Sequence, residues 1–141
     1  MIFHSRNKNV ELGDADEKEL ENWIYPTNYA IRKYQFDICK TAIFNNTLVC
    51  LPTGLGKTLI ASVVMYNYYR WFPDGKVIFL APTKPLVNQQ IKACYEVMGI
   101  PESDTAHLEG TVLADKRNNI WDKHRVFYCT PQVLSNDIES G

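Results

Sequence analysis

The glycine-rich segment 52–58, Pro-Thr-Gly-Leu-Gly-Lys-Thr, constrains the fold of this chain of 141 residues more than any other feature. It follows a short apolar run at 47–51 and precedes a segment in which apolar residues recur at helical spacing. A strand, a glycine-rich turn and a helix in this order form a loop that cradles phosphate groups. Gly54 and Gly56 let backbone N–H groups turn toward a phosphate because no Cβ stands in the way. The sequence therefore predicts a phosphate-binding loop.

The two residues that end this loop carry the predicted chemistry. Lys57 can reach the β- and γ-phosphates of ATP, and the hydroxyl of Thr58 can hold Mg²⁺. We therefore predict ATP and Mg²⁺ as cofactors, Lys57 and Thr58 as catalytic residues, and Thr58 as the metal ligand. The general pattern has glycine six residues before the lysine, where this chain has Leu51. That leucine disfavours the loops of adenylate kinases and small GTPases, and favours the helicase variant, whose loop begins with proline or alanine.

Helical and strand patterns alternate along the rest of the chain. The spacing of apolar residues predicts helices at about 29–44, 57–71, 85–98 and 112–121 and from Pro131 onward, and strands at 47–51, 77–81, 105–108 and 125–129. The strands are continuously apolar, which indicates a parallel sheet covered by helices on both faces. Ligands of such sheets bind at the carboxyl ends of strands. We therefore expect function in the loops after Leu51, Ala81 and Cys129.

Composition predicts one domain boundary and places few constraints on function. Residues 11–24 carry six acidic residues and one lysine, so we expect residues 1–22 to be a disordered acidic leader and residues 23–141 to be the folded domain. The net charge of −1 gives no indication of nucleic-acid binding, which must come from individually placed groups. We expect no membrane span, because no apolar run is long enough. The four cysteines lack C-x-x-C spacing, which favours free thiols over a zinc site or disulfides.

Three further segments resemble elements of superfamily 2 helicases. Residues 32–35, Arg-Lys-Tyr-Gln, lie upstream of the phosphate loop, as the adenine-reading element of that superfamily does. Residues 81–90 resemble motif Ia, and residues 130–132, Thr-Pro-Gln, resemble the later T-P-x element. A weaker similarity at 109–111 suggests the element between them. The alternative for each is a solvated helix face or an ordinary helix cap.

The resemblance implies a role for each matching residue. Gln35 and Arg32 would contact the adenine base, and the two strand ends that follow would grip the backbone of a DNA strand. The implied nucleotide-binding residues are Arg32, Gln35, Pro52, Thr53, Gly54, Leu55, Gly56, Lys57 and Thr58, and the implied DNA-binding residues are Thr83, Lys84, Thr130 and Gln132. The implied fold class is α/β: the first RecA-like helicase domain, a P-loop NTPase with a parallel sheet flanked by helices.

The amino-acid sequence of the chain is similar to the sequences of one family within that superfamily. Residues 23–29, 48–58 and 69–73 closely resemble the Fanconi anaemia group M family, which is related to archaeal Hef helicase-nucleases; the similarity covers about 23–138. The resemblance implies a nuclear, ATP-driven helicase or translocase that acts on branched or forked DNA in replication-fork and crosslink repair. Its DNA-repair partner proteins would bind outside this segment.

The sequence also leads us to expect an incomplete motor domain. The Walker B carboxylates and the second RecA-like domain would follow Gly141, so we expect weak nucleotide binding and little hydrolysis from this segment by itself. The missing strands of related folds lie between the phosphate-loop strand and the motif Ia strand. Two alternatives remain at this stage: a non-catalytic module that binds nucleotide or DNA, and another P-loop enzyme such as a kinase.

Overall fold

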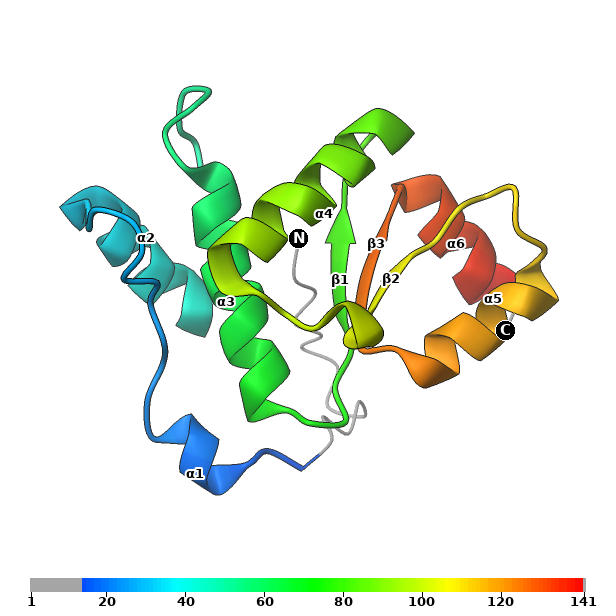
Figure 1. Ribbon diagram of the computed structural model, residues 1–141, viewed down its shortest axis with the longest axis horizontal. Coiled ribbons are helices and arrows are strands. Elements are labelled where there is room, and N and C mark those ends of the chain that lie inside the picture. Colours follow the sequence, from blue (N-terminus) through cyan, green and yellow to red (C-terminus); the bar gives the residue numbers. More distant parts are fainter. Residues whose placement is uncertain (1–13, 141) are drawn as a thin grey trace.

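A three-stranded parallel sheet forms the centre of the molecule (Figure 1). The computed structural model describes residues 14–140. The strands are β1 (Val77–Leu80), β2 (Thr105–His107) and β3 (Val126–Cys129), in the order β1-β3-β2. The register pairs Leu80 with Cys129 and His107 with Tyr128, so all three strands end at the same edge. The predicted parallel sheet is therefore confirmed for these strands.

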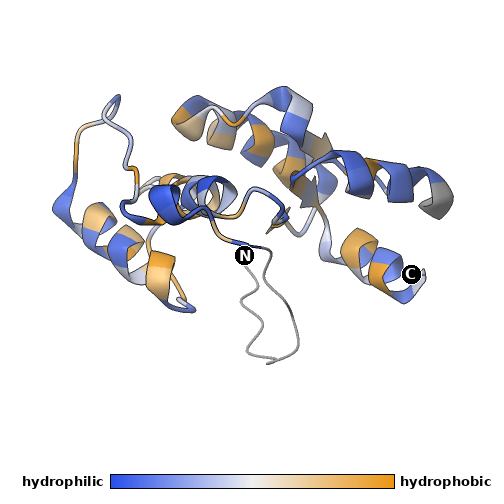
Figure 2. Ribbon diagram, turned by 90° about the horizontal axis from the view of Figure 1, so that it is seen from below, coloured by the Kyte–Doolittle hydropathy of each residue, from blue (hydrophilic) through white to orange (hydrophobic). Residues whose placement is uncertain are grey.

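Helices cover both faces of this sheet. They are α1 (Glu17–Leu20), α2 (Lys33–Phe44), α3 (Lys57–Trp71), α4 (Lys84–Met98), α5 (Ala114–Lys123) and α6 (Pro131–Ser140), with a short 3-10 helix, η1, at Glu102–Asp104. On one face Val126 and Tyr128 pack against α3 and α4, and on the other Phe127 and Cys129 pack against α5 and α6. Figure 2 shows hydrophobic and hydrophilic residues on different sides of the helices, as this packing requires. Within residues 14–140, none of the helices combines the length and the apolar character that a membrane span needs.

Local residues mark both ends of α4. Thr83 is the N-cap residue, Pro85 lies in the first turn, and Gly99 terminates the helix in the left-handed conformation with φ 58°. Proline suits the first turn because its missing N–H has no partner there, and glycine tolerates the left-handed region. The helix therefore begins directly after the strand end that bears the motif Ia-like residues.

The predicted strand at 47–51 is not formed, and this is a correction. Among the described residues the sheet has three strands, and 47–51 is not one of them. Val49 and Leu51 pack against the core formed by α2 and α3, whereas Leu48 is 88% exposed. An apolar run becomes a strand only when another strand satisfies its backbone N–H and C=O groups, and no described segment does so here.

The expected leader is also partly ordered. Asp16 caps α1 by accepting hydrogen bonds from the backbone N–H groups of Lys18 and Glu19. The N–H of Asp16 donates to the carbonyl of Trp71 at 2.8 Å, and Arg70 pairs with Glu19. Residues of the segment 16–22 therefore have partners on α3 that composition does not reveal, and the boundary at residue 22 stays a prediction. Residues 1–13 of the expected leader lie outside the described residues.

The four cysteines are free thiols in this structure. Cys39, Cys94 and Cys129 are buried, and Cys50 is exposed. Burial raises the pKa of Cys39 to about 12 and that of Cys129 to about 11. The buried thiols therefore stay protonated at neutral pH and act as small apolar core residues.

A buried ion pair joins α5 to α6. The guanidinium of Arg117 donates from Nε to both carboxylate oxygens of Asp137, at 2.8 and 2.9 Å, and Trp121 Nε1 donates to the same carboxylate at 2.9 Å. Burial by itself raises the pKa of Asp137, but these hydrogen bonds outweigh it and hold the pKa below its usual value. The pair therefore stays ionised inside the domain.

Replacing Arg117 by methionine should lower the free energy of unfolding by about 3 kcal/mol, because Asp137 would stay buried without its partner. Lys116→Met on the exposed side of α5 is the control and should cost less than about 0.5 kcal/mol. Urea unfolding of both variants measures this. Since the pKa of Asp137 is lowered, the stability from its charge is present above about pH 4 and is lost as the pH falls further. Equal midpoints for the two variants would contradict the structural role of the pair.

Candidate functional site

The glycine-rich segment forms a turn that leads directly into α3. Gly54 and Gly56 have positive φ angles of 82° and 92°, and α3 begins at Lys57. A Cβ built on Gly54 would meet no atom within 4 Å, so the surface of the loop is open at that point. The ammonium group of Lys57 donates to the carbonyl of Leu51 at 2.9 Å, which folds the side chain back across the loop. The loop therefore presents N–H groups, a helix N-terminus and an ammonium group together.

Gln35, the predicted adenine-contacting residue, lies against this loop. Its Nε2 donates to the carbonyl of Leu55 at 3.0 Å, and its side chain is almost completely buried. A Cβ on Gly56 would come within 1.9 Å of Gln35 Nε2, so only glycine leaves room for the amide. The side chain of Gln35 thus connects α2 to the loop by a hydrogen bond.

A second donor reaches the same carbonyl. The hydroxyl of Tyr34 donates to the Leu55 carbonyl at 3.0 Å, and Arg32 Nη1 donates to the Tyr34 hydroxyl at 3.3 Å. Arg32 therefore reaches the loop only through Tyr34, a residue that the sequence analysis did not select. Its position directly before Gln35 was the available signal, since both lie in the first turn of α2.

Thr58, the predicted metal ligand, connects α3 to α4. Its hydroxyl donates to Gln90 Oε1 at 2.8 Å. Gln90 lies in the second turn of α4, the helix whose first turn bears Thr83 and Lys84. Sequence reasoning missed Gln90, because nothing local indicates a contact across 32 residues.

These residues fit the phosphates of a nucleotide. Two glycines with positive φ, open space above Gly54 and the N-terminus of α3 form a cradle that side chains would otherwise fill. For Mg²⁺, Thr58 offers one oxygen. In the part of the chain that the structure describes, no group of three or more His, Cys, Asp and Glu side chains could hold a metal ion. The phosphates would have to supply other ligands of the ion.

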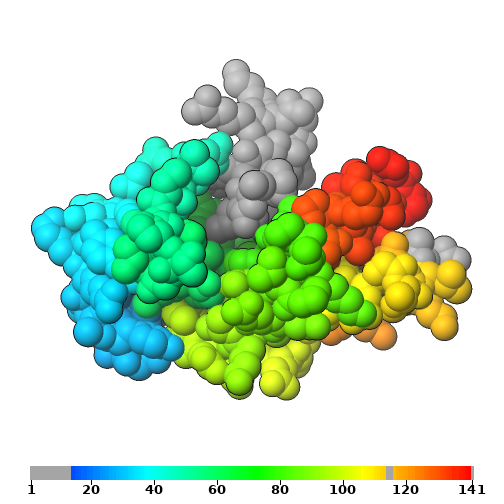
Figure 3. All heavy atoms as spheres, turned by 90° about the horizontal axis from the view of Figure 1, so that it is seen from above, coloured from blue at the N-terminus to red at the C-terminus, as the bar shows by residue number. Residues whose placement is uncertain are grey.

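The predicted DNA-binding residues gather at the carboxyl edge of the sheet. Thr83 follows β1, and Thr130 follows β3, where its carbonyl accepts the N–H groups of Val133 and Leu134 at the start of α6. Figure 3 looks onto this edge, where the phosphate loop (teal), the β1–α4 connection (light green), the segment after β2 (yellow) and the start of α6 (orange to red) reach the surface. The site residues from distant parts of the chain therefore share one face.

The side chains at this edge differ in their partners. Lys84 pairs with Glu109 at 2.7 Å, and Gln132 Nε2 donates to Asn136 within α6 at 3.0 Å. The hydroxyl of Thr83 makes no capping bond to α4. Lys84 thus forms an ion pair with Glu109, which follows β2.

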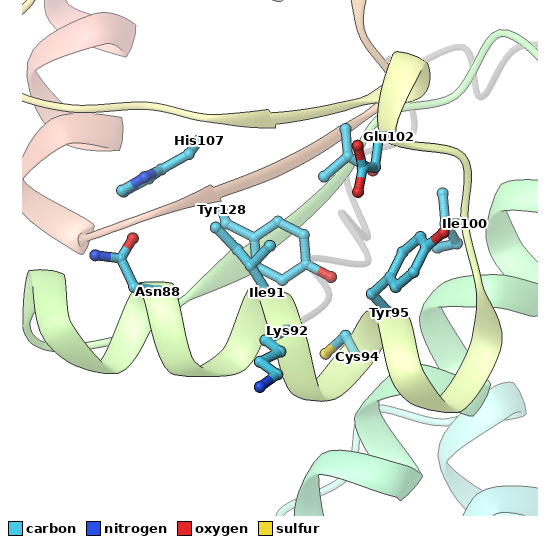
Figure 4. Close-up of a pocket in the computed structure, with 10 residues that line it drawn as sticks. Asn88, Ile91, Lys92, Cys94, Tyr95, Ile100, Glu102, His107 and Tyr128 are labelled. Atoms are coloured by element: carbon cyan, nitrogen blue, oxygen red, sulfur yellow. The ribbon is translucent and has the colours of Figure 1, made fainter.

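A separate cavity of about 550 Å³ lies between α4, η1 and the strands β2 and β3 (Figure 4). Its lining includes Ile91, Tyr95, Glu102, His107 and Tyr128 and contains no residue of the phosphate loop. Burial raises the pKa of Tyr128 above its usual value, so the phenol is neutral there. None of the predicted site residues lines this cavity.

Comparison with known proteins places this arrangement in a family. The model of the DEAD/DEAH box helicase family matches residues 32–140. The chain is 62% identical over 119 residues to a Fanconi anemia group M protein homolog of Mus musculus, a match that covers 84% of this chain and 6% of that protein. It is 53% identical over 128 residues to an ATP-dependent DNA helicase of Schizosaccharomyces pombe, covering 91% of this chain and 15% of that helicase. The chain thus spans a small part of these relatives, and the resemblance to the Fanconi anaemia group M family is confirmed.

Solved structures give the same fold. The Hef helicase domain of Pyrococcus furiosus superposes with a TM-score of 0.69 at 36% identity, over 79% of this chain and 23% of that one. The UvsW helicase of bacteriophage T4 superposes with a TM-score of 0.59 at 24% identity, over 84% and 42%, and supports the fold alone. The predicted α/β, RecA-like helicase fold is confirmed. The chain belongs to the DEAD/DEAH box helicase family.

Proposed function

We propose that this chain is the nucleotide-binding part of an ATP-dependent DNA helicase or translocase that acts in the nucleus on branched or forked DNA in replication-fork and crosslink repair. The supporting observation is the single edge that carries both the phosphate loop and three strand ends. Relatives named as DNA helicases and as Fanconi anemia group M proteins support the DNA substrate and the repair setting. Partner repair proteins would bind outside this segment.

On the nucleotide side, the loop would bind the phosphates of ATP through N–H groups of residues 52–58. Lys57 would leave the Leu51 carbonyl and pair with the β- and γ-phosphates, and Thr58 would contribute a ligand to Mg²⁺. Bound Mg²⁺ would neutralise charge that develops on the phosphates. Gln35, with Nε2 on the Leu55 carbonyl, keeps its Oε1 for the adenine edge, and Arg32 would stack on the base.

On the DNA side, we propose backbone recognition. Thr83, Lys84, Thr130 and Gln132 lie at strand ends that lead into helices, where N–H groups and hydroxyls suit phosphate oxygens. Such contacts position a strand without reading its sequence. A motor that moves along DNA requires this property.

We further propose that turnover belongs to the longer protein and that this segment binds nucleotide weakly by itself. Thr58 is one ligand, and hydrolysis also needs a carboxylate that orients water. A DNA-stimulated ATPase assay on this segment and on the full-length parent tests the division. Vigorous hydrolysis by the segment would contradict it.

Lys57→Ala in the full-length parent should lower ATP turnover by orders of magnitude, because the charge on the β- and γ-phosphates is lost. Steady-state phosphate release with and without DNA measures this. Lys40→Ala, at an exposed position of α2 outside the loop, removes an equal charge and is the control. Near-normal turnover in Lys57→Ala would refute the ATPase assignment.

Gly56→Ala should weaken nucleotide binding more than Gly54→Ala does. Both alanines meet backbone strain at positive φ, about 1–2 kcal/mol, but only the Cβ at Gly56 displaces Gln35. Titration of the parent with a fluorescent ATP analogue measures the difference. In a Gln35→Ala background the two alanines should cost about the same, and a persistent difference there would disprove the role of Gln35.

Thr83→Ala and Thr130→Ala should weaken DNA binding by the parent about equally for all base sequences, since the proposed contacts are to phosphates. Fluorescence anisotropy with two single-stranded oligonucleotides of different composition measures this. Loss of affinity for one oligonucleotide but not the other would show base recognition in place of backbone contact.

A further inference from the structure

One carboxylate lies at the proposed DNA edge, after the outer strand β2. Glu109 lies just beyond the end of β2, and its Oε2 accepts from the Lys84 ammonium at 2.7 Å and from the Thr111 hydroxyl at 3.4 Å. Nδ1 of His107 lies 3.6 Å from its Oε1. The hydrogen bond from Lys84 holds the pKa of Glu109 below its usual value, so the carboxylate is charged at neutral pH.

The partners of Glu109 are the groups that bind phosphate in proteins. An ammonium, a hydroxyl and an imidazole that can donate all favour an anion with several acceptor oxygens. A carboxylate has the same sign of charge and presents two of those oxygens. The contacts of Glu109 are thus those expected of a bound phosphate.

The loop that carries Glu109 is anchored from the opposite side. Arg117 donates to the carbonyl of Val112 and, at 3.5 Å, to that of Glu109, while its Nε is held by the buried Asp137. The buried pair fixes the backbone on both sides of Gly110, although Glu109 itself is near the surface. The carboxylate is therefore held at Lys84 by its backbone and by charge together.

We propose that Glu109 is an internal substitute for a DNA phosphate. Its carboxylate pairs with Lys84 in the free protein, and the DNA backbone must displace it. This inference rests on the proposed backbone contact of Lys84. Glu109 then limits the affinity for DNA, and it reduces by one the number of phosphates that the edge neutralises. An ordinary surface salt bridge with no phosphate competitor would leave both quantities unchanged.

The test uses Glu109→Gln in the full-length parent, with fluorescein-labelled single-stranded oligothymidylate as the probe. Glutamine keeps the shape and frees Lys84, so affinity near 0.1 M NaCl should rise roughly three- to tenfold, and the slope of log K against log salt should steepen by about 0.7. The matched control is Glu102→Gln, which removes the same charge before β2, at the other end of the strand. Equal affinities and slopes for the two variants would overturn the proposal.

A second background separates this inference from the proposed function. Lys84→Gln should weaken binding and flatten the salt slope, and Glu109→Gln added to it should then bring no gain beyond that of Glu102→Gln. If Lys84→Gln lowers the affinity for DNA but Glu109→Gln does not raise it, the competition alone is overturned and the backbone contact stands. Unchanged binding in Lys84→Gln overturns the backbone contact and the competition with it. Thermal melting of each variant confirms that the fold is intact.

Discussion

The parallel pairing of β3 with both of its neighbours is the constraint on which the rest depends. All four residues of β3 are buried, and their side chains alternate between the α3–α4 face and the α5–α6 face. Parallel strands end at a common edge, so the segments after β1, β2 and β3 must meet there. Each leads toward a helix, which places free N–H groups at the same edge. The candidate site thus follows from topology before any side chain is considered.

The nucleotide loop and this edge are connected through one helix. The first turn of α4 bears Thr83 and Lys84, and its second turn bears Gln90, which accepts the hydroxyl hydrogen of Thr58. The loop is held on its other side by Gln35 and Tyr34, which both donate to the Leu55 carbonyl. Because α3 and α4 pack along each other and share a core with the sheet, the loop and the first turn of α4 are parts of one packed unit.

Local signals in the sequence predicted most of the architecture, and contacts across the chain account for what it missed. Helical spacing, the glycines of the loop, and Pro85 with Gly99 around α4 act over a few residues, so they can be read directly. The run at 47–51 has the composition of a strand, but a strand also needs a partner, and none is described beside it. The helix α1 depends on Arg70 and Trp71 of α3. The contacts of Tyr34, Gln90 and Glu109 likewise require knowledge of which turns and helices meet.

The effect of the charged side chains likewise depends on where they lie and on which partners they have. The chain has 15 basic and 16 acidic residues, a balance that by itself indicates no preference for a polyanion. What matters at the strand-end edge is whether each cation is already paired. Lys84 is paired with Glu109, and Arg117 is consumed in a buried pair that holds the Glu109 loop. Because the cation at this edge is already paired, the proposed DNA binding would depend on hydroxyls, helix N-termini and exchangeable pairs more than on long-range attraction. For the proposed translocase, contacts of moderate strength that are replaced one at a time would favour release as well as binding.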